Sequence, residues 1–200
     1  MEPMLTARNL RIICDIDNIL ADTLPHWLSA IARKYGVYAE INDINQYDLT
    51  QCYPLDKLSR SSVFEFLQQP GFTTGIPPMP GAVAVINQLI EDGHEVYLVT
   101  ARTGATHIIE TFAWVKNHLP SFDLARLVFM KDKHLIRADI LIDDNPETLL
   151  KFFQSNPAGQ LYSIEYPYNS VLNNVDYIQM FQYGHDAWEA IYKEITRNFQ

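Results

Sequence analysis

The sequence predicts an α/β protein: a Rossmann-like parallel β-sheet with helices on both faces and a small helical cap inserted after the first strand. From about residue 81 onward, short aliphatic runs alternate with helical patterns, as is typical of right-handed crossovers in a parallel sheet. Residues 22–76 interrupt this alternation with aromatic and polar residues and no strong strand. We therefore expect a core formed by residues 1–21 and 77–200, with a cap formed by 22–76.

The composition is that of a folded protein with one sizeable core. Of the 200 residues, 48% are hydrophobic and 20% are charged. The net charge of −9 argues against a nucleic-acid polymer as partner. No apolar run reaches the ~20 residues of a membrane span, and we expect no membrane association and no signal peptide. Cys14 falls in a predicted buried strand, which favours a reducing, cytoplasmic compartment over a disulfide with Cys52.

The first predicted strand ends in two carboxylates. Residues 10–17 read LRIICDID, an aliphatic run of the kind that is buried on both faces, followed by Asp15 and Asp17. Buried carboxylates need a cation or hydrogen bonds, and residues i and i+2 of a strand point to the same side. The two acids can therefore converge on one centre. Taken alone, the motif is better explained by an ordinary Asp-rich turn.

The inserted segment is predicted to be helical. A first helix begins at Asp22 or Thr23, both good N-cap residues, and ends at Gly36. Trp27 lies at helical spacing with other apolar residues, so we expect it in the core rather than against a ligand. A second helix is predicted over 55–69, before a Pro-Gly turn. This segment is too small for an independent domain, so we expect it to lie over the core.

Beyond the insertion, a proline-rich linker at residues 76–81 leads back to the core. The sequence then predicts a helix over 81–92, a strand over 95–100, a helix over 105–118, strands over 126–130 and 138–142, a helix capped by Asn145, a strand over 160–164 and a last helix beginning at a capping box, 186–189.

Polar side chains gather where these strands end. They are Asp15 and Asp17 after the first strand, Thr100 at the end of the second, Lys131 and Lys133 after the third, and Asp143 and Asp144 after the fourth. Ligands of open parallel sheets bind beyond the carboxyl ends of the strands, so these side chains should meet in one crevice. Several carboxylates there would repel one another without a hard cation, and Mg²⁺ fits because it also binds substrate phosphate. A hydroxyl and a lysine supply further phosphate donors.

With these motifs in order, the chain resembles the haloacid dehalogenase (HAD) superfamily of phosphatases. More narrowly, it resembles the 5′(3′)-deoxyribonucleotidases and related bacterial nucleotidases, and this likeness runs from about residue 10 to 170. The segments that carry it are DIDNILAD (15–22), PGF (70–72), PMPGAVAVINQLIEDGHEVYLVTAR (78–102) and DKHLIRADILIDDNPE (132–147). Two departures stand out: Asn18 replaces a usual glycine, and Ala101-Arg102 replaces a different pair found in the animal enzymes.

The resemblance implies a role for each matching residue. Asp15 would be the nucleophile that forms an aspartyl-phosphate, and Asp17 the acid and base. Mg²⁺ would be held by Asp15, Asp17 through its backbone carbonyl, and Asp144. The phosphate would be bound by Thr100, Ala101 and Lys133, with Lys131 as the alternative lysine. Asp143 would orient the phosphate-binding lysine without contacting the phosphate itself.

The resemblance also gives the cap a role, because in this family a small helical cap covers the crevice and selects the leaving group. Aromatic side chains could stack there on a nucleobase, and the candidates are Tyr47, Tyr53, Phe64 and Phe72. For each one, a place in a small hydrophobic core between cap and body is the alternative.

The implied function is therefore a phosphomonoesterase for a small phosphorylated substrate, a nucleoside monophosphate. Three alternatives stay open at this point: the same chemistry on a sugar phosphate, a non-catalytic phosphate-binding module and, least favoured, a response-regulator receiver. A homodimer is also left open.

Overall fold

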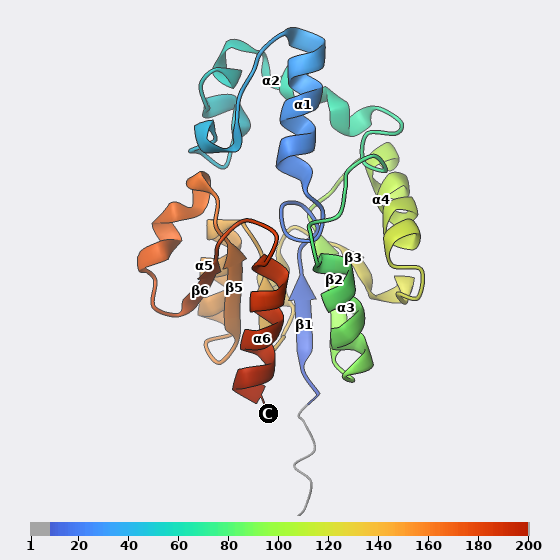
Figure 1. The fold of residues 1–200 in the computed structure, drawn as a ribbon, viewed down its shortest axis with the longest axis vertical. Coiled ribbons are helices and arrows are strands. Elements are labelled where there is room, and N and C mark those ends of the chain that lie inside the picture. The colour runs from blue at the N-terminus through green and yellow to red at the C-terminus, as the bar shows by residue number, and fades with distance from the viewer. Residues whose placement is uncertain (1–8, 200) are drawn as a thin grey trace, which may run out of the picture.

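The computed structural model describes residues 9–199 and has a single parallel sheet as its centre (Figure 1). The six strands lie in the order β3-β2-β1-β4-β5-β6. They are β1 (Arg11–Cys14), β2 (Glu95–Thr100), β3 (Leu127–Phe129), β4 (Ile140–Ile142), β5 (Gln160–Ile164) and β6 (Ile178–Phe181). The predicted fold class is confirmed. The sequence pattern missed one strand, β6, which pairs with β5 at the edge of the sheet.

The helices follow the predicted order. They are α1 (Thr23–Tyr35), α2 (Arg60–Phe64), α3 (Ala82–Glu91), α4 (Ala105–His118), α5 (Pro146–Ser155) and α6 (Ala187–Phe199). The single helix predicted over 55–69 is wrong. Two 3₁₀ turns, Leu55–Lys57 and Glu65–Gln68, flank the short α2. The Ser59 hydroxyl caps α2 by accepting a hydrogen bond from the Ser62 amide. Because of this local bond, a new helix begins after Ser59, and the 3₁₀ turn Leu55–Lys57 does not continue into it.

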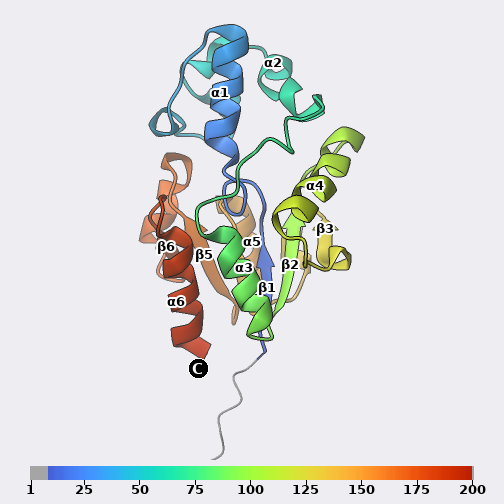
Figure 2. The same ribbon diagram turned by 45° about the vertical axis from the view of Figure 1, so that its right-hand side comes forward.

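Side chains of β1 alternate between two buried layers, as a strand covered on both faces requires. Ile12 and Cys14 belong to the larger core, which α3, α4 and α6 cover, whereas Ile13 belongs to a smaller core under α5. Figure 2 shows α3 and α6 on one side of the sheet and α5 behind it. Among residues 9–199, none of the helices combines the length and apolarity that crossing a bilayer requires.

The cap, which carries α1 and α2, stands over the carboxyl end of the sheet, where β1 points (Figure 1). The chain enters and leaves it through two connections that pair with each other. The Asp22 amide donates to the Pro77 carbonyl at 2.9 Å, and the Met79 amide donates to the Leu20 carbonyl at 2.8 Å. The Glu110 carboxylate, on α4, accepts from backbone amides of the returning segment at residues 71, 73 and 74. The cap is thus fixed to the body at its base.

The connection order places the ligand crevice next to β1. From β1 the chain moves to β2 and β3 on one side, then crosses to β4, β5 and β6 on the other. Such a reversal opens a crevice beyond the strands' carboxyl ends. The residues that follow β1 and β4 therefore face each other under the cap.

Candidate active site

The structure brings the acids after β1 and β4 together in this crevice. The Asp15 amide donates to the Ile142 carbonyl at 2.9 Å, which extends the β1–β4 pairing by one residue and holds Asp15 at the sheet's rim. The whole residue is only 7% exposed. Asp17 is half-buried, and Asn18 turns the chain with a φ of 58°. This left-handed conformation is tolerated by Asn better than by most residues, so the turn forms without glycine.

Lys133 forms the ionic centre of the site. Its ammonium lies 2.7 Å from Asp15 Oδ1 and 2.7 Å from Asp143 Oδ2, and its side chain is 3% exposed. Burial alone would lower the pKa of Lys133, but the charges of Asp143 and Asp15 outweigh it and raise the pKa above the ordinary value. The lysine therefore stays charged. Lys131, the alternative, is exposed and lines the outer part of the cleft.

Three buried acids form a cluster with the geometry of a cation site. Asp15, Asp143 and Asp144 each offer an oxygen, and these atoms lie within 4.8 Å of one another. Asp143 has both oxygens occupied, by Lys133 and by the Asn145 amide at 2.8 Å. Asp144 Oδ1 is buried and has no hydrogen-bond partner in the described part of the chain. An orphaned buried carboxylate oxygen is costly, and a hard cation would satisfy it.

The electrostatics of Asp15 and Asp144 agree with this fit. Burial, followed by the charge of Asp143, raises the pKa of Asp144 to about 7. Burial also raises the pKa of Asp15 well above its usual range, although the charge of Lys133 opposes the shift. Both acids thus lie in surroundings that disfavour their charge. A divalent cation would favour the charged form of each.

Asp17 belongs to a different network. Arg102 makes two hydrogen bonds to it, at 2.9 Å from Nε and 2.7 Å from a terminal nitrogen, and Thr23 Oγ1 donates at 2.7 Å. Arg102 is 4% exposed and is held in turn by Thr111 Oγ1. Burial alone would raise the pKa of Asp17, but the charge and hydrogen bonds of Arg102 outweigh it and lower the pKa. Since Thr23 opens α1, Asp17 contacts both body and cap.

The predicted phosphate ligands from β2 border the same space. Thr100 is 1% exposed, and its Oγ1 accepts from the Arg102 amide at 3.2 Å, which leaves the hydroxyl proton free to donate into the crevice. Ala101 is exposed, and both residues line the cleft with Asp15 and Asp17.

A cleft of about 710 Å³ lies above these groups, and its far wall comes from the cap. Tyr47 and Phe64, two of the four predicted stacking residues, line it. Phe72 is buried inside the cap against Trp27 and Phe66, and Tyr53 is 68% exposed beneath the Lys57 ammonium. The structure therefore puts two of the four aromatic residues on the wall of the cleft and two away from it.

Trp27 packs against the larger hydrophobic core, as predicted, but it is not fully buried in it. It is half-buried and lines the cleft, with its ring edge-on to Phe64 at 5.3 Å and its indole N–H bonded to the Val63 carbonyl. The Arg60 guanidinium lies over the Phe64 ring, 4.8 Å from the ring centroid, and pairs with Asp48. The cap wall of the cleft is thus aromatic with one charged pair.

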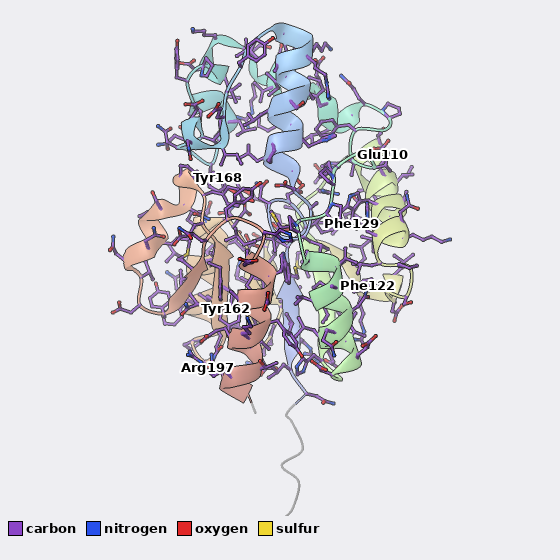
Figure 3. All side chains as sticks on the ribbon, in the orientation of Figure 1. Glu110, Phe122, Phe129, Tyr162, Tyr168 and Arg197 are labelled. Atoms are coloured by element: carbon purple, nitrogen blue, oxygen red, sulfur yellow. The ribbon has the colours of Figure 1, made fainter. Side chains whose placement is uncertain are left out.

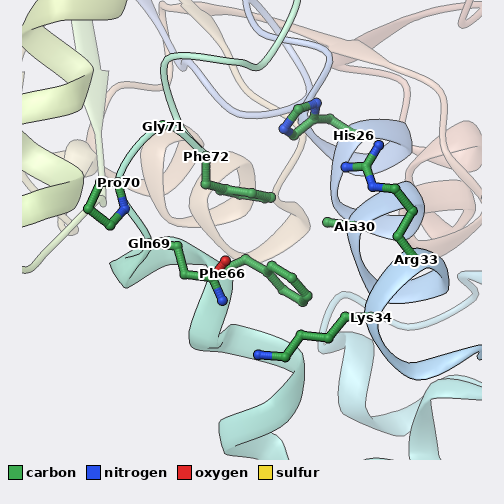
Figure 4. Close-up of a pocket in the computed structure, with 9 residues that line it drawn as sticks. All are labelled: His26, Ala30, Arg33, Lys34, Phe66, Gln69, Pro70, Gly71 and Phe72. Carbon is green, nitrogen blue, oxygen red and sulfur yellow. The ribbon is translucent and has the colours of Figure 1, made fainter.

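A second depression, of about 420 Å³, lies in the cap itself (Figure 4). His26, Arg33 and Lys34 of α1 face Phe66 and Phe72 across it, but none of the clustered acids lines it. Lys34 is already paired with Glu65. Asp15 and Asp17 therefore open into the cleft between cap and body and not into this depression.

Comparison with known proteins places this geometry in a family. The model of the family "5′ nucleotidase, deoxy (pyrimidine), cytosolic type C protein" matches residues 8–195. The chain belongs to this nucleotidase family. A putative 5′(3′)-deoxyribonucleotidase of Staphylococcus epidermidis is 32% identical over 140 residues, covering 70% of this chain and 76% of the relative. One of Bordetella parapertussis is 34% identical over 139 residues, covering 68% and 74%.

Solved structures share the fold of this nucleotidase family member. A HAD family hydrolase from Deinococcus radiodurans, solved with bound phosphate and sodium, superposes with a TM-score of 0.56 at 13% identity, covering 95% of this chain and 97% of that one. A predicted phosphatase from Clostridium acetobutylicum also gives 0.56, at 15% identity, covering 95% and 100%. The expected membership in the HAD phosphatases is confirmed, and the chain is a phosphoric monoester hydrolase.

Several residues of this nucleotidase site were not predicted from the sequence. Arg102 and His107 lie beside Asp17, and Tyr168 donates a hydrogen bond to Asp144. Arg102 follows the threonine at the end of β2, so its position at a strand end was a usable signal. Tyr168 lies in a 3₁₀ segment, Pro167–Asn174, after β5, where the sequence shows no distinctive pattern.

Proposed function

We propose that this protein is a Mg²⁺-dependent nucleotidase that removes phosphate from (deoxy)nucleoside monophosphates through an aspartyl-phosphate. The observation that carries the proposal is the contact between Asp15 and the buried Lys133 under a cleft whose far wall is aromatic. A carboxylate beside a buried lysine is suited to phosphoryl transfer. An aromatic wall is suited to stacking on the planar base of a nucleoside leaving group. The names of the bacterial relatives and the phosphate and sodium bound to the Deinococcus protein support it.

In the proposed reaction, Asp15 attacks phosphorus with the oxygen that Lys133 leaves free. Asp15 Oδ1 accepts from Lys133 and from the Ile16 amide at 2.7 Å, whereas Oδ2 has no hydrogen bond in the described structure. The bond from phosphorus to the nucleoside oxygen breaks, and that oxygen takes a proton from Asp17, which must therefore be protonated at this step although Arg102 favours its charged form. Asp17 then takes a proton from a water whose oxygen bonds to phosphorus, and the bond from phosphorus to Asp15 breaks, which releases inorganic phosphate and restores the Asp15 carboxylate.

Two donors stabilise charge on the transferring phosphoryl group in this scheme. The Thr100 hydroxyl and the Lys133 ammonium are buried and fixed before substrate arrives, so they need no reorganisation. Asp15, the Asp17 carbonyl and Asp144 would hold Mg²⁺, which would supply positive charge to the phosphate oxygens. Asp143, whose oxygens are both occupied, would keep Lys133 in place.

Phosphate release from a panel of substrates tests the proposal. The panel contains deoxy- and ribonucleoside monophosphates and simple sugar phosphates, with Mg²⁺ and with a chelator. We expect nucleotides to be preferred, the chelator to abolish turnover, and Asp15→Asn to reduce kcat by about 10³-fold or more. Preference for sugar phosphates would reject the substrate class, and full activity of Asp15→Asn would reject the nucleophile.

A further inference from the structure

Asn18 links the acid cluster to the first helix of the cap. Its side-chain amide donates to Asp144 Oδ2 at 3.1 Å and to the Tyr168 hydroxyl at 3.1 Å, and its side-chain oxygen accepts from the Leu24 amide at 2.9 Å. The Leu24 N–H can only donate, so it fixes which end of the Asn18 amide faces α1 and which faces Asp144. One side chain thus touches both parts of the molecule.

The bond to Leu24 performs the work of a helix cap. The first amides of a helix lack partners within it, and a side chain just before the helix usually satisfies one. Asp22 occupies that position in α1 but makes no such bond, because its carboxylate accepts from the Tyr183 hydroxyl instead. Asn18, which precedes Thr23 by five residues, supplies the missing acceptor.

The bonds to Asp144 decide which of its oxygens is available. Oδ2 accepts from both Asn18 and Tyr168, and Oδ1 is the buried oxygen without a partner. Tyr168 lies where the body meets the cap (Figure 3), and its ring stacks on Tyr166, whose hydroxyl donates to the Asn18 carbonyl at 3.0 Å. Asn18 is therefore held through both its backbone carbonyl and its side chain.

We propose that Asn18 is a positioning residue that couples cation binding at Asp144 to the seating of the cap. The inference rests on the proposed metal site. A cation on Oδ1 fixes the Asp144 carboxylate, the carboxylate fixes the Asn18 amide, and the amide holds the first turn of α1. Because such coupling is reciprocal, a well-seated α1 also strengthens cation binding. A glycine could adopt the φ of 58° at this position but could make none of the three side-chain bonds.

Three variants separate the parts of this linkage. Asn18→Gly keeps the turn and removes both connections. Tyr168→Phe removes the other donor to Asp144 but leaves the bond to Leu24. Ser59→Ala removes a helix cap on α2, in the same part of the molecule but without contact to the acids. Circular dichroism serves to check that each variant is folded.

The measurements are Mg²⁺ affinity by calorimetry and exchange of the Leu24 amide by NMR, each without substrate. In the wild type, Mg²⁺ should slow Leu24 exchange by about fivefold or more. Asn18→Gly should bind Mg²⁺ about tenfold or more weakly and lose the effect of saturating Mg²⁺ on Leu24. Tyr168→Phe should bind Mg²⁺ more weakly but keep that effect at saturation, and Ser59→Ala should match the wild type.

The proposal is overturned if Mg²⁺ does not slow Leu24 exchange in the wild type, or if Asn18→Gly responds to saturating Mg²⁺ as the wild type does. Unchanged Mg²⁺ affinity in Asn18→Gly also overturns it. Neither measurement needs turnover, so a failure of the nucleotidase assay with intact coupling would reject the substrate and leave the linkage standing.

Discussion

Removing the Lys133 ammonium should destabilise the protein more than any exposed lysine could. In Lys133→Met the hydrocarbon stem is largely retained and only the charge is lost. Asp143 then keeps one hydrogen bond, from the Asn145 amide, and Asp15 keeps one, from the Ile16 amide. Both carboxylates stay buried, at 0% and 9% side-chain exposure. The variant thus holds a cluster of acids without its cation.

The magnitude follows from the burial of the pairs. Breaking a buried ion pair by removing one partner costs about 3–5 kcal/mol, because the remaining charge is uncompensated. Lys133 serves two such partners, but its own desolvation cost disappears with it, so we expect a loss of about 3–5 kcal/mol in the free energy of unfolding. For a chain of this size that corresponds to a Tm lower by roughly 10 °C. Phosphatase activity should be lost as well.

Urea unfolding in a chelator, followed by tryptophan fluorescence, measures the effect. Lys131→Met is the matched control, since Lys131 is exposed two residues away and should change stability by about 0.5 kcal/mol or less. Adding Mg²⁺ should stabilise Lys133→Met more than the wild type, because the variant has no other cation beside the acids. A loss below about 1 kcal/mol, or one equal to that of Lys131→Met, would refute the reasoning.

Three further outcomes are expected. Phe64→Ala should raise KM for a nucleotide by roughly 5- to 100-fold in initial-rate assays, because Phe64 lines the cleft. Phe72→Leu, a change inside the cap, should leave KM unchanged. Equal effects of the two variants would show that Phe64 does not contact the substrate. Burial, followed by the charge of Arg102, lowers the pKa of His107 from 6.5 to about 4. As the pH drops from 6.5 towards 4, the unfolded chain therefore binds this proton before the folded chain does, and the free energy of unfolding falls. The urea midpoint of His107→Gln should fall less over this pH window than that of the wild type. Glu110→Ala should leave three backbone amides of the segment 71–74 without their acceptor, and limited proteolysis of this segment should become faster. An unchanged cleavage rate would mean that the paired connections at the base of the cap hold the segment in place without Glu110.

The body of the fold could be predicted because its signals are local and strong. A parallel strand covered on both faces must be aliphatic throughout, so β1 and β2 stand out from their surroundings. The acids that follow β1 and β4 were informative because a buried strand end is an expensive place for a carboxylate. Periodicity and caps gave α4 its full extent and placed Asn145 at the start of α5. Each of these features is set within about ten residues of sequence.

The missed features depend on contacts between distant residues. β6 is a short edge strand, and only its pairing with β5 distinguishes it from a loop. Trp27 has the helical spacing of a core residue and packs against the core, but it also lines the cleft, and the pattern of α1 alone does not show which of its residues border that cleft. Arg102 owes its role to Asp17, 85 residues earlier. Sequence spacing cannot rank such pairings.

The paired connections at the base of the cap separate the length of the cap from the strand order of the sheet. Because Asp22 and Leu20 are bonded to Pro77 and Met79, the chain returns to the body close to the place where it departed. The length of the cap between these two connections therefore does not affect the pairing of the strands. A foreign segment grafted between these two connections would leave the strand order unchanged, but it would have to keep the first turn of α1, because Thr23 and Leu24 bond to Asp17 and Asn18. The strand order of this fold is thus independent of the length of the cap, whereas the contacts of Asp17 and Asn18 depend on the first turn of α1.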